Sequence, residues 1–138
     1  MTKLESGLLI KVNTWLTSPI DQDKLDRYLK LVRQLTDILG FEGSDLIIPV
    51  LIYSERFIQK NGLTQPEKLP IFFALATCIA IKFWEEEGKK CCKLKYVAIL
   101  IGFSSKDFAR LERELLTGLK FDLFITEDEY KDFKDILT

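Results

Sequence analysis

The chain has 138 residues and a mass of 16.0 kDa, which is the length of one ordinary domain. Hydrophobic residues make up 47% of the sequence and charged residues 30%, a composition typical of globular proteins rather than disordered chains. The net charge of -1 disfavours a dedicated nucleic-acid-binding protein, which normally carries a basic excess. The absence of histidine excludes His-based triads, His general bases and His metal ligands.

The three cysteines, Cys78, Cys91 and Cys92, form neither a disulfide framework nor a zinc-ligand spacing. We therefore expect reduced thiols without a bound metal, in a reducing intracellular compartment. The longest apolar run, Ile71 to Ile81, is too short to span a bilayer, and the N-terminal sequence lacks the apolar core of a signal peptide. The sequence thus predicts no cofactor, no metal ion and no membrane partner.

Helix signals recur along the whole chain, and no stretch alternates apolar and polar residues as a half-buried strand would. Helix starts are predicted at Ser18 with Pro19, at Thr64 in a Thr-x-x-Glu capping box, at Ser104, and at Thr126 in a second such box. Glycines that follow apolar residues predict the helix ends. The predicted helices cover residues 3–16, 19–39, 45–61, 65–86, 92–101, 105–119 and 127–137. This pattern predicts a single all-α domain.

The helix over residues 65–86 is expected to lie at the centre of the domain. Its segment IFFALATCIAI is apolar on every side, so other helices must surround it. The neighbouring helices are amphipathic: Phe108, Leu111, Leu115 and Leu119, for example, form one apolar stripe of the helix over 105–119.

Two charged residues lie beside these apolar surfaces. Lys82 follows the apolar run and shares a helix face with Ile79, and Glu112 lies at the edge of the stripe that contains Leu111. Taken alone, Lys82 is explained as a cation in a last turn, where it favours the helix dipole and can pair with the acids that follow. Glu112 is similarly explained as a solvated acid at the core boundary, paired with a nearby cation.

Three stretches of the sequence resemble helices of the cyclin box. LIYSERFIQKNGLT is similar to the second helix of that box, and LATCIAIKFWEEE is similar to the third, in which small and apolar residues precede Lys-Phe and acids. KYVAILIGFSSKDFARLERELLTGLKFDLFITEDEY resembles the fourth and fifth helices and the segment that leaves them. The resemblance runs from Leu46 to Phe133, and the compact single-box layout is most similar to the Pho-type (phosphate-pathway, P/U) cyclins.

The resemblance implies an all-α, five-helix cyclin-box bundle over about residues 20–123, within a single domain spanning residues 1–138. A short N-terminal helix precedes the box and a helical extension follows it. The implied function is a non-catalytic regulatory subunit that binds and activates a cyclin-dependent protein kinase by holding the kinase's C helix inward. We expect a monomer when the chain is alone, a heterodimer with the kinase, and a place in the cytoplasm, the nucleus or both.

The resemblance also implies a binding site. In cyclins, the residues that match Lys82 and Glu112 bind backbone groups of the segment leading into the kinase's C helix. Apolar residues around this pair hold the helix itself, and by resemblance they are Ile79, Phe83, Leu116, Phe121 and Leu123. Charged groups within an apolar patch make directional hydrogen bonds, and the apolar area supplies the association energy.

The sequence departs from the family in three places. The substrate-recruiting Met-Arg-Ala-Ile-Leu patch is absent, because aligning Arg27 with its arginine puts Asp26, Lys30 and Arg33 where apolar side chains are needed. Glu55 stands where the second helix normally has Asp. The chain also holds one box, where many cyclins have two.

Three other classes of function remain open on the sequence alone. A cyclin-fold interaction module, such as a scaffold or an inhibitor, would use the same groove for a partner that is not a kinase. A nucleic-acid-binding protein of the general-transcription-factor kind is disfavoured by the pI of 5.6 and the lack of a basic stripe. An enzyme is disfavoured because the sequence has no histidine, no Gly-rich phosphate loop and no paired buried carboxylates.

Overall fold

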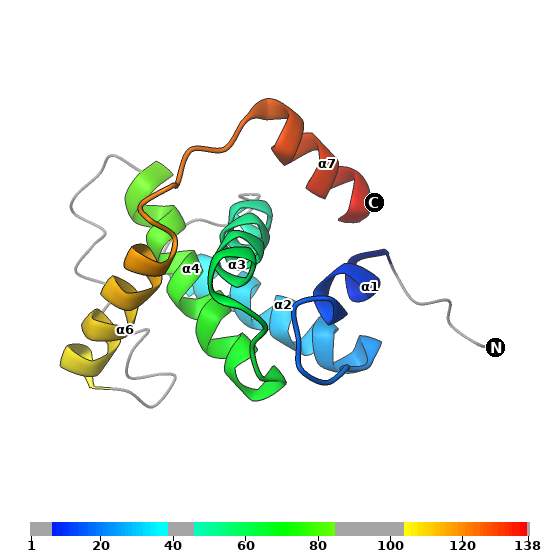
Figure 1. Cartoon of the computed structure of the whole chain (residues 1–138), viewed down its shortest axis with the longest axis horizontal. Helices are drawn as coiled ribbons and strands as arrows, with labels where there is room; N and C mark the ends of the chain where they lie inside the picture. Colours follow the sequence, from blue (N-terminus) through cyan, green and yellow to red (C-terminus); the bar gives the residue numbers. More distant parts are fainter. Residues whose placement is uncertain (1–6, 39–45, 85–103, 138) are drawn as a thin grey trace.

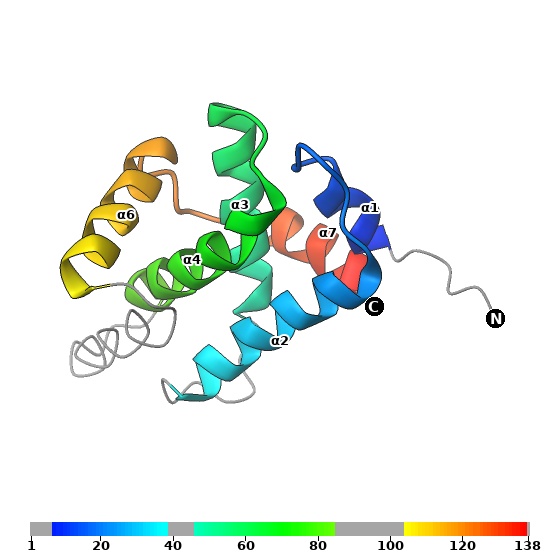
Figure 2. The same cartoon turned by 90° about the horizontal axis from the view of Figure 1, so that it is seen from below.

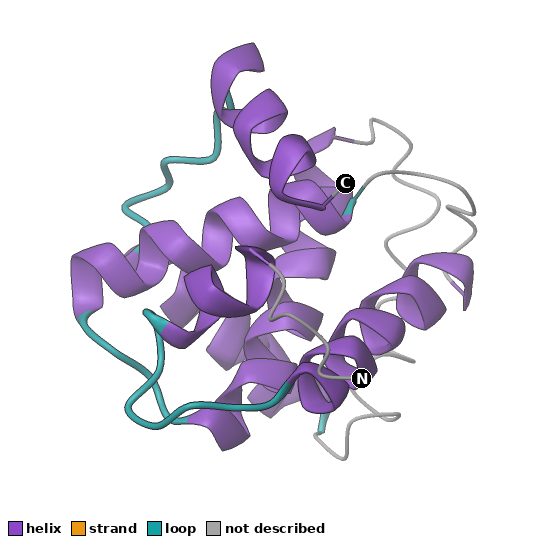
Figure 3. Cartoon of the chain, turned by 90° about the vertical axis from the view of Figure 1, so that its right-hand side faces the viewer, coloured by secondary structure: helices purple, strands orange, loops and turns teal. Residues whose placement is uncertain are grey.

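The structure is a computed structural model that describes residues 7–38, 46–84 and 104–137. Within these ranges it is helical and has no strand, which confirms the predicted all-α class (Figure 3). The elements are α1 (Gly7–Asn13), α2 (Gln22–Ile38), α3 (Ile47–Asn61), a 3-10 turn (Pro66–Lys68), α4 (Leu69–Trp84), α6 (Ser105–Gly118) and α7 (Glu127–Leu137). The helix expected over 92–101 lies outside the described residues. None of the described helices combines the length and the apolar character needed to cross a bilayer.

Helix α4 is the centre of the domain, as its apolar sequence predicts. It packs against α2, α3 and α6, and Figures 1 and 2 show it between these helices. Phe73 and Cys78 are fully buried, and Cys78 forms no disulfide with another described residue. Cys91 and Cys92 lie outside the described residues.

Helices α2 and α3 face the core through regular apolar stripes. In α2 the buried side chains Leu25, Leu29, Val32 and Leu35 recur at intervals of three and four residues, which places them on one face. Pro49 lies in the first turn of α3, where its missing N–H costs no helix hydrogen bond.

The start of α2 lies later than the Ser18 signal predicts. Asp21 caps this helix instead, because its side chain accepts a hydrogen bond from the backbone N–H of Lys24 at 2.8 Å. The side chain of Asn13 binds both backbone groups of Ile20, at 2.9 and 3.2 Å, and so holds the preceding residues outside the helix. A contact with α1 therefore outweighs the local Ser-Pro signal.

The capping box predicted at Thr64 is wrong. The backbone of Thr64 pairs with the segment that follows α1: its N–H donates to the carbonyl of Trp15 at 3.0 Å, and its carbonyl accepts from Thr17 at 2.9 Å. Pro66 then begins the 3-10 turn, so α4 starts only at Leu69. Backbone pairing between segments distant in sequence thus replaces the expected cap.

The two later caps are confirmed. The hydroxyl of Ser104 accepts from the N–H of Asp107 at 3.1 Å. The hydroxyl of Thr126 accepts from the N–H of Glu129 at 3.2 Å, while the carboxylate of Glu129 accepts from the N–H of Thr126 at 3.5 Å, which is the reciprocal capping box. Gly62 ends α3 with a φ of 99°, a conformation that glycine adopts readily.

Helix α7 packs on α3 and α1 (Figures 1 and 2). The ammonium of Lys11 lies 5.0 Å from the centre of the Phe133 ring and 3.0 Å from a carboxylate oxygen of Glu55. Glu55 also accepts a hydrogen bond from the indole N–H of Trp15 at 3.3 Å. The acid that departs from the family pattern therefore joins α1 and the segment after it to α3.

Candidate functional site

Residues 119–124, which we call the exit segment, begin the connection from α6 to α7 and pass the C-terminal end of α4 (Figure 1). Helix α3 holds the backbone of this segment. Its side chains donate hydrogen bonds to four carbonyls of the segment: Tyr53 to Leu123 at 2.8 Å, Arg56 to Asp122 at 2.8 Å and to Phe124 at 2.7 Å, and Lys60 to Leu119 at 3.0 Å. The exit segment is thus positioned by a helix far away in sequence.

Arg56 is the centre of this set of bonds. Its side chain is largely buried and also pairs with the carboxylate of Glu129 in α7, at 2.8 Å. Partial burial by itself raises the pKa of Glu129, but the hydrogen bond and the charge of Arg56, with two hydrogen bonds to Thr126, hold that pKa below its ordinary value. Arg56 therefore joins α3, the exit segment and α7.

The backbone of the exit segment contains two adjacent residues in the left-handed region. Lys120 has a φ of 54° and Phe121 a φ of 55°. This conformation costs a non-glycine residue about 1 kcal/mol or more. The N–H of Phe121 donates to the carbonyl of Leu116 at 3.0 Å, which turns the chain sharply at the end of α6. The turn leaves the Phe121 side chain 67% exposed.

An open groove with a volume of about 270 Å³ lies between α4, α6 and the exit segment. We call it the exit groove, and its lining residues are Ile79, Phe83, Glu112, Leu116, Phe121 and Leu123. The structure thus brings together every predicted site residue except Lys82. Lys82 belongs to α4, but its side chain lies outside the described part of the structure, as does any contact between Lys82 and Glu112.

Helical periodicity places these residues on the groove. Ile79 and Phe83 are four residues apart in α4, and Glu112 and Leu116 are four residues apart in α6, so each pair lies on one helix face. Ile79 is buried and forms part of the floor, whereas Phe83 is 45% exposed. The groove therefore combines a buried floor with exposed aromatic rings.

Glu112 is 8% exposed, so it is not the solvated boundary acid that its sequence position alone suggests. A carboxylate that is largely withdrawn from water is a strong hydrogen-bond acceptor, because its charge is poorly screened there. Among the described residues that line the groove, Glu112 is the one charged side chain, and the others are apolar.

The exit groove has an apolar lining with exposed aromatic rings. Exposed aromatic rings around an apolar hollow are typical of protein–protein interfaces. In the described ranges, no three side chains of the Cys, Asp and Glu types gather as metal ligands would. The exposed side chains of Asp26, Arg27, Lys30 and Arg33 give α2 a charged surface.

The α3 side chains that position the exit segment are not among the predicted site residues. A sequence signal for them does exist, because Tyr53, Arg56 and Lys60 are spaced by three and four residues and therefore share one helix face. That spacing does not identify their partners, which lie 59 to 70 residues away in sequence.

No family model, curated protein or solved structure matches this chain. The interpretation of the exit groove therefore depends on the residues that line it, on their burial, and on the motifs in the sequence.

Proposed function

We propose that this chain is the non-catalytic regulatory subunit of a cyclin-dependent protein kinase, with a single five-helix cyclin box over about residues 20–123. The exit groove is the observation that carries the proposal. Residues that the cyclin resemblance implies for kinase binding, spread over two helices and a connection, line one open hollow. In this proposal α2, α3, α4 and α6 are four of the five box helices, and the packing of α4 against the other three is consistent with that assignment.

In this proposal the kinase's C helix lies along the exit groove. Phe83 and Phe121 cover its apolar side chains, and Glu112 accepts backbone N–H groups from the segment that leads into it. Burial of a phenylalanine side chain is worth about 1.5–3 kcal/mol, so the two exposed rings are expected to supply much of the affinity.

Activation follows because the chain binds one conformational state of the kinase more tightly than the other. When the C helix lies inward, its glutamate pairs with the lysine that orients ATP, which an active kinase requires. A groove that fits the inward helix better than the outward helix shifts the kinase toward the active state by the difference in binding energy. The chain itself needs no catalytic residue.

The first experiment identifies the partner and measures its activity. Proteins captured from a native lysate on the purified chain are identified by mass spectrometry, and a captured kinase is then purified and assayed on a peptide substrate with and without the chain. We expect a cyclin-dependent kinase whose activity depends on the chain. A kinase with unchanged activity, or a partner of another class bound through the same groove, would contradict the proposed function.

Two glutamates of α6 offer a matched pair of variants. Glu112 lines the exit groove, whereas Glu114, two residues along, is exposed on another side of the helix. Glu112→Gln should weaken kinase binding by about tenfold or more, because it removes the charge from a desolvated hydrogen bond. Glu114→Gln should leave the affinity unchanged. Calorimetric titration gives both affinities, and equal losses in the two variants would place the kinase elsewhere.

A further inference from the structure

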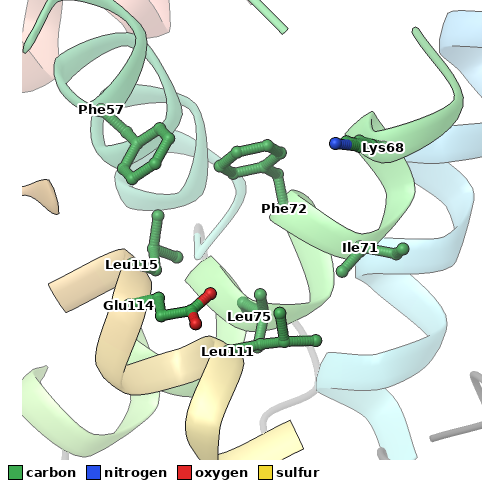
Figure 4. A pocket seen from close by; sticks show the side chains of 8 residues that line it. All are labelled: Phe57, Lys68, Ile71, Phe72, Leu75, Leu111, Glu114 and Leu115. Atoms are coloured by element: carbon green, nitrogen blue, oxygen red, sulfur yellow. The ribbon is translucent and has the colours of Figure 1, made fainter. Parts of the chain in front are cut away.

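A second hollow opens on the other side of α6, between α3, α4 and α6, with a volume of about 290 Å³ (Figure 4). We call it the side cavity. Its apolar lining consists of Phe57, Ile71, Phe72, Leu75, Leu111 and Leu115. Figure 4 shows the rings of Phe57 and Phe72 across the hollow from Leu111 and Leu115. No residue of the exit groove lines it.

A polar hollow adjoins the side cavity. This basic recess has a volume of about 440 Å³ and shares Phe57 and Glu114 with the side cavity. Arg110 and Arg113 line it, three residues apart and therefore on one side of α6. Both guanidinium groups are on exposed side chains, and neither forms an ion pair with another residue of the described ranges. The recess therefore offers two cations to a ligand.

The charges around the joined hollows favour an acidic ligand. Lys68 lines the side cavity and, like the two arginines, makes no ion pair within the described part of the chain. Among the described residues that line either hollow, Glu114 is the one acid. Three cationic side chains against one carboxylate leave a positive local field in a protein whose net charge is -1.

The shape favours an extended peptide rather than a small molecule. A small-molecule site encloses most of its ligand, whereas these open hollows lie on adjacent faces of α6, the side cavity beside Leu111 and Leu115 and the basic recess beside Arg110 and Arg113. A helix with its side chains is about 10–12 Å across, so a ligand that reaches from one face to the next extends about 10 Å. About three residues of extended chain cover the same distance. An apolar side chain in the side cavity would therefore place a residue two or three positions away beside the arginines.

We propose that the side cavity and the basic recess together form a docking site for a short extended segment of a partner protein. The segment carries an aromatic or leucine anchor and, two or three residues away, one or more acidic side chains. The anchor fills the side cavity, and the acidic groups pair with Arg110 and Arg113. The site is independent of the proposed kinase groove.

The test uses three short fluorescein-labelled peptides and the full chain. The first peptide has one phenylalanine and, two and three residues after it, two glutamates, in a serine–glycine background. In the second, lysines replace the glutamates, and in the third, serine replaces the phenylalanine. Fluorescence anisotropy at fixed ionic strength should show the first peptide binding about tenfold or more tightly than either of the others. Equal binding of all three peptides would overturn the proposal.

Substitutions at exposed positions locate the bound peptide without disturbing the core. Arg110→Ser combined with Arg113→Ser should remove the preference for the acidic peptide, and Glu114→Gln should increase its affinity a few-fold by removing the one opposing charge. Phe121→Ala, in the exit groove, should leave the affinity unchanged. Loss of binding in that variant would place the peptide in the exit groove and refute the second site.

A second copy of the chain is the competing occupant. The exposed ring of Phe124 precedes the exposed acids Glu127 and Asp128 by three and four residues, a spacing similar to that of the proposed ligand. Sedimentation velocity should show a monomer at the concentrations of the peptide assay. A dimer that the acidic peptide dissociates would overturn the proposal in favour of self-association.

Discussion

The exit groove and the side cavity have nearly the same volume, about 270 Å³ and about 290 Å³, yet their walls are built differently. One wall of the exit groove is an irregular segment with left-handed backbone, which hydrogen bonds from α3 hold in place. Three helices packed through apolar side chains form the side cavity. The first hollow depends on polar contacts between distant parts of the chain, and the second depends on core packing.

The charges of the two hollows also differ. Glu112 is buried in the wall of the exit groove, where a hydrogen bond to its carboxylate would be directional and poorly screened by salt. Lys68 and Glu114 are exposed at the side cavity, where charge steers a ligand but is screened. Binding at the exit groove should therefore depend less on ionic strength than binding at the side cavity.

Arg56→Ala is the strongest way to separate the two hollows. It removes a largely buried guanidinium and leaves its three partners, two carbonyls and the Glu129 carboxylate, without this donor. We therefore expect the free energy of unfolding to fall by about 3 kcal/mol. The exit segment should loosen and kinase affinity should fall, while peptide binding at the side cavity persists under conditions where the chain stays folded. Urea unfolding measures the first effect.

Arg56→Lys is the matched control, because it keeps the charge but cannot reach both carbonyls and Glu129 with one planar group. It should lie between the parent and Arg56→Ala in stability. A loss of less than about 1 kcal/mol in the alanine variant would mean that the exit segment does not depend on this residue.

Leu75→Ala is the converse test, because it changes the lining of the side cavity and none of the described residues that line the exit groove. Leu75 is buried in α4 and lines the side cavity, so the substitution enlarges a hollow that already exists and should cost about 2 kcal/mol, at the lower end of the range for such changes. Thermal unfolding measures the loss, and Leu111→Ala, half-buried on the opposite wall, should cost less. An unchanged melting temperature for Leu75→Ala would show that this residue is not part of the core.

The smallest expected effect is the pH dependence of the stability that Glu129 contributes. The pKa of Glu129 is lowered in the folded protein, so its contribution to stability is present above the pKa of the unfolded chain and is lost as the pH falls through the folded value. Glu129→Gln should therefore be less stable than the parent at neutral pH, by under about 1 kcal/mol because the carboxylate is partly exposed. The difference should vanish in acid.

Urea unfolding from neutral pH down to about pH 3 follows this change. Glu127→Gln is the control, since Glu127 is an exposed acid in the same first turn of α7. A difference between Glu129→Gln and the parent that stays constant with pH would show that the Arg56 pair does not set the acid stability of the exit segment.

Helix positions could be predicted from sequence because apolar periodicity is a local signal. The all-round apolar segment of α4 and the stripes of α2 and α6 identify both the helices and their buried faces. The starts of α2 and α4 were harder, because Asn13 and Trp15 decide them through contacts that no local pattern contains. Tertiary bonds override capping signals where the two compete.

The candidate site shows the same contrast between local sequence signals and contacts made by the folded chain. The residues of the exit groove were implied by the resemblance of the sequence to the cyclin box, and helical periodicity is consistent with it, since it places Ile79 with Phe83 and Glu112 with Leu116. The function of Arg56 was not apparent, because its carbonyl partners are 66 and 68 residues away in sequence. The side cavity was also missed, since a gap between packed helices depends on how side chains fit and not on their pattern.

The most direct test of the exit groove compares two phenylalanines. Phe121 and Phe124 are three residues apart and almost equally exposed, at 67% and 68%, but only Phe121 lines the exit groove. Calorimetric titration with the captured kinase should show that Phe121→Ala weakens binding by about tenfold to a hundredfold, the effect of losing one buried ring. Phe124→Ala should bind like the parent, and both variants should keep the parent's melting temperature. Equal affinities for the two variants would contradict a kinase site in the exit groove.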